Sequence, residues 1–374
     1  MIIARFQTHS GLKQRYKSLR KLILILFIII LFPRITIGQK SGEFLTERPG
    51  RWILTNTVNR CPGLNTTAFE SNLSSIAEWV HQNDIILNPT KGFDAAVNLS
   101  GNLCDHKTSI EDYGIQGLVS FSFRYFYINN GKMETASGWL AHGTEILVNN
   151  PIRFTGTQFD EAGFNTGDPA HLKQPLEKAL ANLKQYYFVA PVKREIEKGV
   201  RLYSNGAVVV FNPERPEMWI PVTVKEVMEA KLAYYKIKNE IDSIKYEKML
   251  AAWAKLNFKP DNAVRPNTYN IIKAEYDEFS PDKLNQPAYY SSSEKVSQIG
   301  TYAEGKLMVA RFNTACWDKS LPPAAVQFLS MEYKPASPSE LEGFKRRNGG
   351  LTDYVGLFYN SLPLERTHTL IHKP

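Results

Sequence analysis

The sequence predicts an α+β fold, with antiparallel sheets built from hairpins, segregated helices and one long central helix at about residues 223–256. Two observations lead to this prediction. Strand-like segments follow one another through short turns, whereas a parallel sheet would need a crossover, usually helical, between successive strands. The long helix also carries start and stop signals that do not depend on its apolar pattern.

The helix at 223–256 is the strongest single signal. Thr223 and Glu226 match a capping box, in which each side chain satisfies a backbone donor at the helix start, and Pro260 follows the end. At 1.5 Å per residue the helix would be about 50 Å long, so we expect it to be a scaffold. Apolar residues at three- and four-residue steps predict one buried face: Val227, Tyr234, Ile237, Ile241 and Ile244, then Met249, Trp253 and Leu256 after a change of phase.

The strands are expected in pairs. Residues 117–128 form the longest alternating segment, and one hairpin is predicted to join residues 200–203 to 207–211 through Asn205-Gly206. A second hairpin is expected between residues 296–302 and 306–312. Further strands are predicted at 85–87, 93–99, 133–149, 269–276 and 326–333, and further helices at 67–81, 175–189, 337–348 and 352–361.

A polar, glycine-rich loop at residues 150–169 is the expected domain boundary. It separates a β-rich N-terminal region of residues 39–165 from a mixed α+β region of residues 166–374, which includes the long helix. The two regions could also form one continuous domain.

The first 38 residues have the three parts of a secretory signal peptide. A basic stretch precedes the apolar residues 22–32, and the small residues Thr36 and Gly38 precede Gln39, the expected new N-terminus. The alternative is a membrane anchor through residues 22–37. Cleavage is favoured because eleven apolar residues span about 17 Å as a helix, well short of a hydrocarbon core of roughly 30 Å. We therefore expect a secreted or periplasmic protein.

The signal peptide also explains the charge. It contains seven of the 45 Lys and Arg residues and none of the 37 Asp and Glu residues, so the mature chain is nearly neutral. A near-neutral chain gives no reason to expect nucleic acid as a partner. No sequence motif calls for a cofactor or a metal ion, and we predict neither.

Three cysteines permit at most one intramolecular disulfide. Cys61 and Cys104 are the expected pair because both lie in loop-like sequence, which leaves Cys316 as a buried apolar residue or a reactive thiol. The chain also contains three N-glycosylation sequons, at Asn65, Asn72 and Asn98.

One group of residues could support hydrolysis. His142 and Glu145 lie close in sequence and Asp168 follows, which supplies a base and an orienting acid. No G-x-S-x-G motif surrounds any serine, so the group is only a candidate catalytic site.

Two other groups could hold a cation. Oxygen-bearing side chains and glycines at residues 160–168 suit Ca²⁺, although a solvated turn explains the same composition. His368 and His372 would share a helix face and could bind Zn²⁺, but an unliganded pair is favoured because no third ligand is near in sequence.

The odd-numbered residues of the longest strand form an aromatic row that could bind a sugar or a protein, or could be buried core. Its candidate binding residues are Phe121, Phe123, Tyr125 and Tyr127. The sequence thus predicts an exported soluble protein of the cell envelope or extracellular space that binds a protein or glycan partner, or is structural, without enzymatic activity. The alternative is a hydrolase that uses His142, Glu145 and Asp168.

Overall fold

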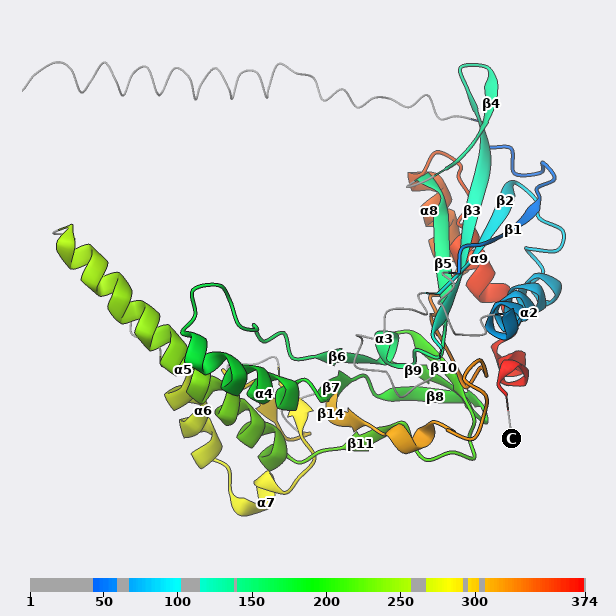
Figure 1. Ribbon diagram of the computed structural model, residues 1–374. Coiled ribbons are helices and arrows are strands. Elements are labelled where there is room, and N and C mark those ends of the chain that lie inside the picture. Colours follow the sequence, from blue (N-terminus) through cyan, green and yellow to red (C-terminus); the bar gives the residue numbers. More distant parts are fainter. Residues whose placement is uncertain are drawn as a thin grey trace, which may run out of the picture.

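The computed structural model describes residues 43–58, 67–101, 115–137, 140–256, 267–291, 295–302 and 307–372. The predicted α+β class is confirmed: two mostly antiparallel sheets are accompanied by separate helices, one of which has 32 residues (Figure 1).

The larger sheet has nine strands in the order β1-β2-β3-β5-β15-β10-β9-β8, with β4 paired to β3. Only β1 and β2 run parallel. Its strands are β1 (Trp52–Asn56), β2 (Phe93–Ser100), β3 (Gly117–Asn129), β4 (Lys132–Thr135), β5 (His142–Val148), β8 (Val192–Glu197), β9 (Val200–Tyr203), β10 (Ala207–Phe211) and β15 (Phe328–Glu332).

Helices cover one face of this larger sheet. They are α2 (Thr67–Asn83), α9 (Tyr354–Ser361) and the 3₁₀ helix η4 (Leu364–Leu370), and α8 (Pro338–Arg347) precedes α9 in the chain. The rings of Phe121 and Phe123 on β3 lie 5.4 and 5.8 Å from that of Phe358 on α9. These contacts belong to the first hydrophobic core.

The smaller sheet has six strands in the order β13-β12-β14-β7-β6, with β11 paired to β14. Its strands are β6 (Gly156–Gln158), β7 (Tyr186–Val189), β11 (Trp219–Pro221), β12 (Tyr289–Tyr290), β13 (Ile299–Gly300) and β14 (Leu307–Phe312). A second core packs it against α4 (Lys173–Leu183), α5 (Val224–Lys255) and α6 (Thr268–Asp277), and a third core lies between the two sheets. The short helices are α3 (Ile152–Thr155), η2 (Ala170–Leu172), α7 (Pro281–Leu284) and η3 (Thr314–Cys316).

The capping box of α5 is confirmed, since the Thr223 side chain accepts from the Glu226 amide and the Glu226 carboxylate accepts from the Thr223 amide. Ile241 is fully buried, but Met249 is 36% and Leu256 76% exposed. The predicted buried face is therefore wrong for the last turns, which project away from the sheets (Figure 1). An apolar pattern shows which face of a helix can be buried. The face is buried only where another part of the chain packs against it, as it does along the first turns of α5.

Four element predictions are wrong. Residues 269–276 belong to helix α6, and the helix expected at 175–189 ends at Leu183, after which β7 begins. Residues 85–87 form a turn with Ile85 77% exposed. The expected hairpin of β13 and β14 is interrupted because β12 lies between them. Short segments fail in this way because tertiary pairing outweighs weak local preference.

The loop at 150–169 does not separate the two sheets. The nine-stranded sheet takes β1 to β5 from residues before this loop and β8, β9, β10 and β15 from residues after it.

The predicted signal at 1–38, the alternative anchor at 22–37, and Cys61 and Cys104 lie outside the described residues. Within the described ranges, no helix combines the length and the apolarity needed to cross a membrane.

Candidate functional site

The three candidate hydrolytic residues occupy separate environments. His142 begins β5 and its ring lies 5.9 Å from that of Tyr125 and 5.4 Å from that of Phe344. Burial lowers the pKa of His142, and the Asp353 carboxylate partly opposes this.

Glu145 lies three residues further along the same strand, so its side chain points to the opposite face of the sheet. It forms an ion pair with Arg153 at 2.7 Å. Asp168 is paired with Lys245 of α5, and this contact holds the pKa of Asp168 below its usual range. No hydrogen bond or ion pair between described residues joins any two of the three candidates, so the hydrolase remains a hypothesis without a shared site.

The aromatic row on β3 is divided between core and surface. Phe121 and Phe123 are 2% and 1% exposed and contribute to the first core, so they offer no stacking surface. Tyr125 and Tyr127 are partly exposed, and the Tyr127 hydroxyl donates to Glu134 at 2.8 Å.

Residues of both candidate cation sites form hydrogen bonds with other residues of the chain. Glu161, in the 160–168 loop, accepts hydrogen bonds from Lys231 and Tyr235 of α5. His372 uses its Nδ1 to accept from the Val326 amide at 3.0 Å. In the part of the chain that the structure describes, no three His, Cys, Asp or Glu side chains are grouped to hold a metal ion.

Cys316 is buried, and burial raises the pKa of its thiol to about 12. This agrees with a buried apolar residue and disfavours a reactive thiol. The sequon residue Asn98 accepts hydrogen bonds from Thr55 of β1 and from Thr57 just after that strand, and Asn72 donates to the Ala324 carbonyl.

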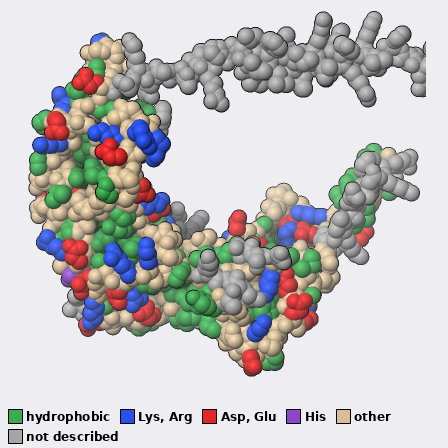
Figure 2. All heavy atoms as spheres, turned by 180° about the vertical axis from the view of Figure 1, so that it is seen from behind, with side chains coloured by type: hydrophobic (Ala, Val, Ile, Leu, Met, Phe, Trp, Pro, Cys, Tyr) green, Lys and Arg blue, Asp and Glu red, His purple; other side chains and the backbone are tan. Residues whose placement is uncertain are grey.

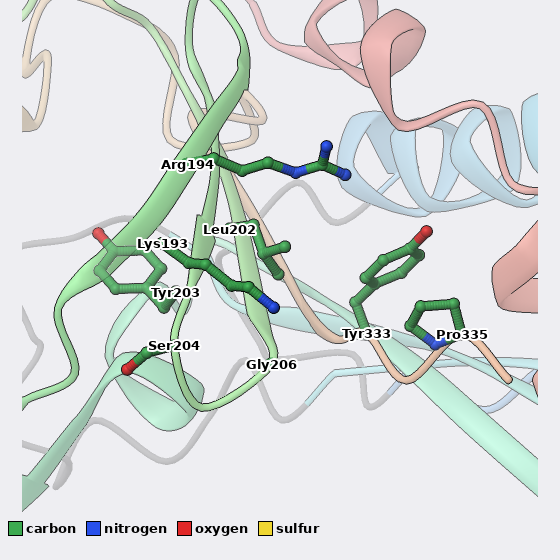
Figure 3. A pocket seen from close by; sticks show the side chains of 8 residues that line it. All are labelled: Lys193, Arg194, Leu202, Tyr203, Ser204, Gly206, Tyr333 and Pro335. Atoms are coloured by element: carbon green, nitrogen blue, oxygen red, sulfur yellow. The ribbon is translucent and has the colours of Figure 1, made fainter. Parts of the chain in front are cut away.

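A cavity of about 390 Å³ at one end of the larger sheet combines unpaired charge with an apolar wall, and we call it the Tyr333 pocket (Figure 3). It is lined by Lys193 and Arg194 of β8, Leu202 and Tyr203 of β9, Ser204 and Gly206 of the following turn, and Tyr333 and Pro335 after β15.

A β-bulge explains how two adjacent residues of β8 line the same pocket. In a regular strand Lys193 and Arg194 would point to opposite faces. Here Val192 pairs with Tyr203 and Arg194 with Leu202, so Lys193 is an extra residue in the ladder. A bulge re-aims side chains in this way. Figure 3 shows the Lys193 side chain extending towards Tyr333, with Arg194 beside it.

Four polar side chains of the Tyr333 pocket have no partner among the described residues. Neither Lys193 nor Arg194 forms an ion pair there, and the hydroxyls of Ser204 and Tyr333 form no hydrogen bond there, whereas the Tyr203 hydroxyl interacts with Trp219. Burial raises the pKa of Tyr333, the positive charge of Arg194 partly offsets this, and the negative charge of Glu365 adds to the increase. The pocket therefore presents two cations and the Tyr333 hydroxyl beside the rings of Tyr333 and Pro335, while the Ser204 side chain points away from those rings (Figure 3).

Tyr333 is held from two sides. Its amide donates to the Gly206 carbonyl at 2.7 Å, which extends the pairing of β15 with the β9–β10 turn. Its ring meets that of Tyr359 edge to face, with centroids 5.7 Å apart. Tyr359 is anchored in turn by a hydrogen bond with Thr144 of β5. The aromatic wall is thus positioned by the sheet and by α9.

A second cavity, of about 380 Å³, lies on the other side of this tyrosine pair. Glu145 and Glu332 line it together with Tyr359. Hydrogen-bonded pairing of β5 with β15 stops at Ile146 and Met331, one position before these two acids. Like charges opposite one another destabilise a ladder, which accounts for the end of the pairing. Arg153 and Lys334 neutralise the two carboxylates.

The chain was compared with protein-family models, with curated proteins and with solved structures, and nothing matched. The function is therefore inferred from the residues that line the Tyr333 pocket and from their contacts.

Lys193, Arg194 and Tyr333 were not among the candidate residues predicted from the sequence. The available signal was Lys193-Arg194 in a strand-like segment that directly precedes the predicted hairpin at 200–211. No sequence pattern pointed to Tyr333. It reaches the pocket because β10 pairs with β15, a strand more than a hundred residues further along the chain.

Proposed function

We propose that this chain is an exported binding protein of the cell envelope or extracellular space, and that the Tyr333 pocket holds an anionic group of its partner. The observation that carries the proposal is the pair Lys193 and Arg194, which a bulge places on one cavity and which form no ion pair with a described residue. Charge-assisted hydrogen bonds from such groups are stronger than neutral ones, and Arg suits carboxylate geometry.

The lining of the pocket favours binding. It contains no carboxylate and no imidazole, the groups most often used to move protons in catalysis. Small-molecule sites usually combine an apolar wall with a few convergent polar groups, and Leu202, Tyr333 and Pro335 supply that wall here.

Binding is tested by titrating the protein with two soluble polyanions, polygalacturonate and poly-glutamate. Lys193→Gln and Arg194→Gln are each expected to weaken binding about 10-fold or more, because each removes a charged hydrogen bond worth about 1.5–3 kcal/mol. Lys198→Gln is the matched control, since Lys198 is an exposed cation just after β8 that already has Glu214 at 3.5 Å. Equal effects of all three substitutions would refute the assignment.

Export is tested separately by intact-mass analysis of protein collected from outside the cytoplasm. The expected chain begins at Gln39. A chain that retains Met1 would contradict signal cleavage and would favour the anchor through residues 22–37.

A further inference from the structure

We infer that the anionic group held in the Tyr333 pocket is the carboxylate of an acidic sugar unit within a glycan. This inference rests on the proposed binding function and narrows its partner to one chemical class. Three features of the pocket carry it: the exposed ring surfaces, the unpaired Tyr333 hydroxyl and the irregular edge of β8.

The first feature is the apolar wall. Tyr333 is only partly buried, and its edge-to-face contact with Tyr359 leaves ring surface on the pocket side, next to the exposed Pro335 (Figure 3). A pyranose has a face of C–H groups, which carry partial positive charge and suit the negative face of an aromatic ring. A sugar ring on Tyr333 would bring a carboxylate within the range of the two cations.

The second feature is the Tyr333 hydroxyl, which projects towards the Arg194 side of the pocket (Figure 3). Hydroxyls both donate and accept, which matches the hydroxyls of a sugar better than the carboxylates of an acidic peptide, since ionised carboxylates only accept.

The third feature disfavours a peptide. β8 is the outermost strand of its sheet, where an extended peptide would gain most by adding a strand. Two register shifts interrupt its ladder with β9, one at Lys193 and one at Ile196. Bulges at an edge prevent regular pairing with another strand.

The volume of the pocket sets the scale of the group that enters. At about 390 Å³ it lies at the lower end of the usual 300–1,000 Å³ of small-molecule sites, too small for a folded partner. A single sugar unit would enter, and its neighbours along the glycan would remain in solvent.

The experiment compares three probes of matched length by calorimetric titration of the processed protein: oligogalacturonate, neutral oligogalactose and oligo-glutamate. Oligogalacturonate is expected to bind at least 10-fold more tightly than either of the others. Tyr333→Ala should weaken that binding about 10-fold, whereas Tyr333→Phe keeps the ring and should cost less than about 5-fold. Thermal melts of both variants check that they fold, and Lys198→Gln should bind as the wild type.

The possible results separate the two proposals. Tightest binding of oligo-glutamate, with the same dependence on Lys193 and Arg194, would overturn the sugar inference and leave the binding function intact. Equal binding of neutral oligogalactose would overturn the role of the carboxylate. No binding of any probe that depends on these two cations would overturn the proposed function and the inference together.

Discussion

The buried pair of Lys231 and Glu161 gives the sharpest stability prediction. The Lys231 side chain is 1% exposed, its Nζ lies 3.0 Å from Glu161 Oε1, and it also lies 4.4 Å from the ring centre of Phe159. The Tyr235 hydroxyl donates to the other carboxylate oxygen at 2.8 Å. Through these contacts Glu161 binds the 160–168 loop to Lys231 and Tyr235 of α5.

Glu161→Gln is expected to cost about 3–5 kcal/mol, because it leaves a buried ammonium without a counter-charge. Lys231→Met should cost less, about 2 kcal/mol, because Glu161 is 15% exposed and water can solvate it. The double variant should be more stable than the sum of the two losses predicts, by about 1–3 kcal/mol of coupling.

Urea unfolding followed by circular dichroism measures these differences at pH 7. Lys225→Met is the matched control on α5, since Lys225 is exposed and contacts Glu229 only at 4.0 Å. It should change stability by less than about 0.5 kcal/mol. An unchanged midpoint for Glu161→Gln would refute the reasoning, because it would show that the buried charge does not need its partner.

The same pair predicts a pH dependence. Burial lowers the pKa of Lys231, and Glu161 partly opposes this. The unfolded chain therefore binds more protons between the folded and unfolded pKa values, so this group contributes stability that increases as pH rises towards 10.5. Lys231→Met should remove that increase.

Three further predictions concern single buried groups. Ile241→Ala should cost about 2–5 kcal/mol because Ile241 is fully buried, whereas Lys238→Ala should be nearly neutral; equal melting midpoints would contradict this. Burial raises the pKa of Asp84 from 3.8 to about 6, so its contribution to stability should be lost as pH rises through that interval, by at most about 3 kcal/mol. Asp84→Asn should flatten unfolding measurements between pH 4 and 7, and an unchanged slope would count against it. Cys316 should resist a thiol reagent until the protein unfolds, and labelling of the native protein at the unfolded rate would disprove its burial.

The sequence by itself determined the elements that depend on contacts between near neighbours. The capping box of Thr223 and Glu226 fixed the start of α5, and Asn205-Gly206 marked the hairpin of β9 and β10. The alternation of apolar and polar residues along β3 likewise predicted a strand, because the backbone geometry of a strand sets a period of two residues. Each of these features is decided within a few residues, so the signal is complete in the sequence.

Only the tertiary structure decided the composition of the sheets and of the Tyr333 pocket. The segment at 269–276 was predicted as a strand, but it is a helix packed on α5. Lys193 and Tyr333 meet because β8, β9, β10 and β15 pair in that order, and a bulge then turns both cations of β8 into one cavity. Strand order and register depend on contacts between distant residues, which a local pattern does not encode.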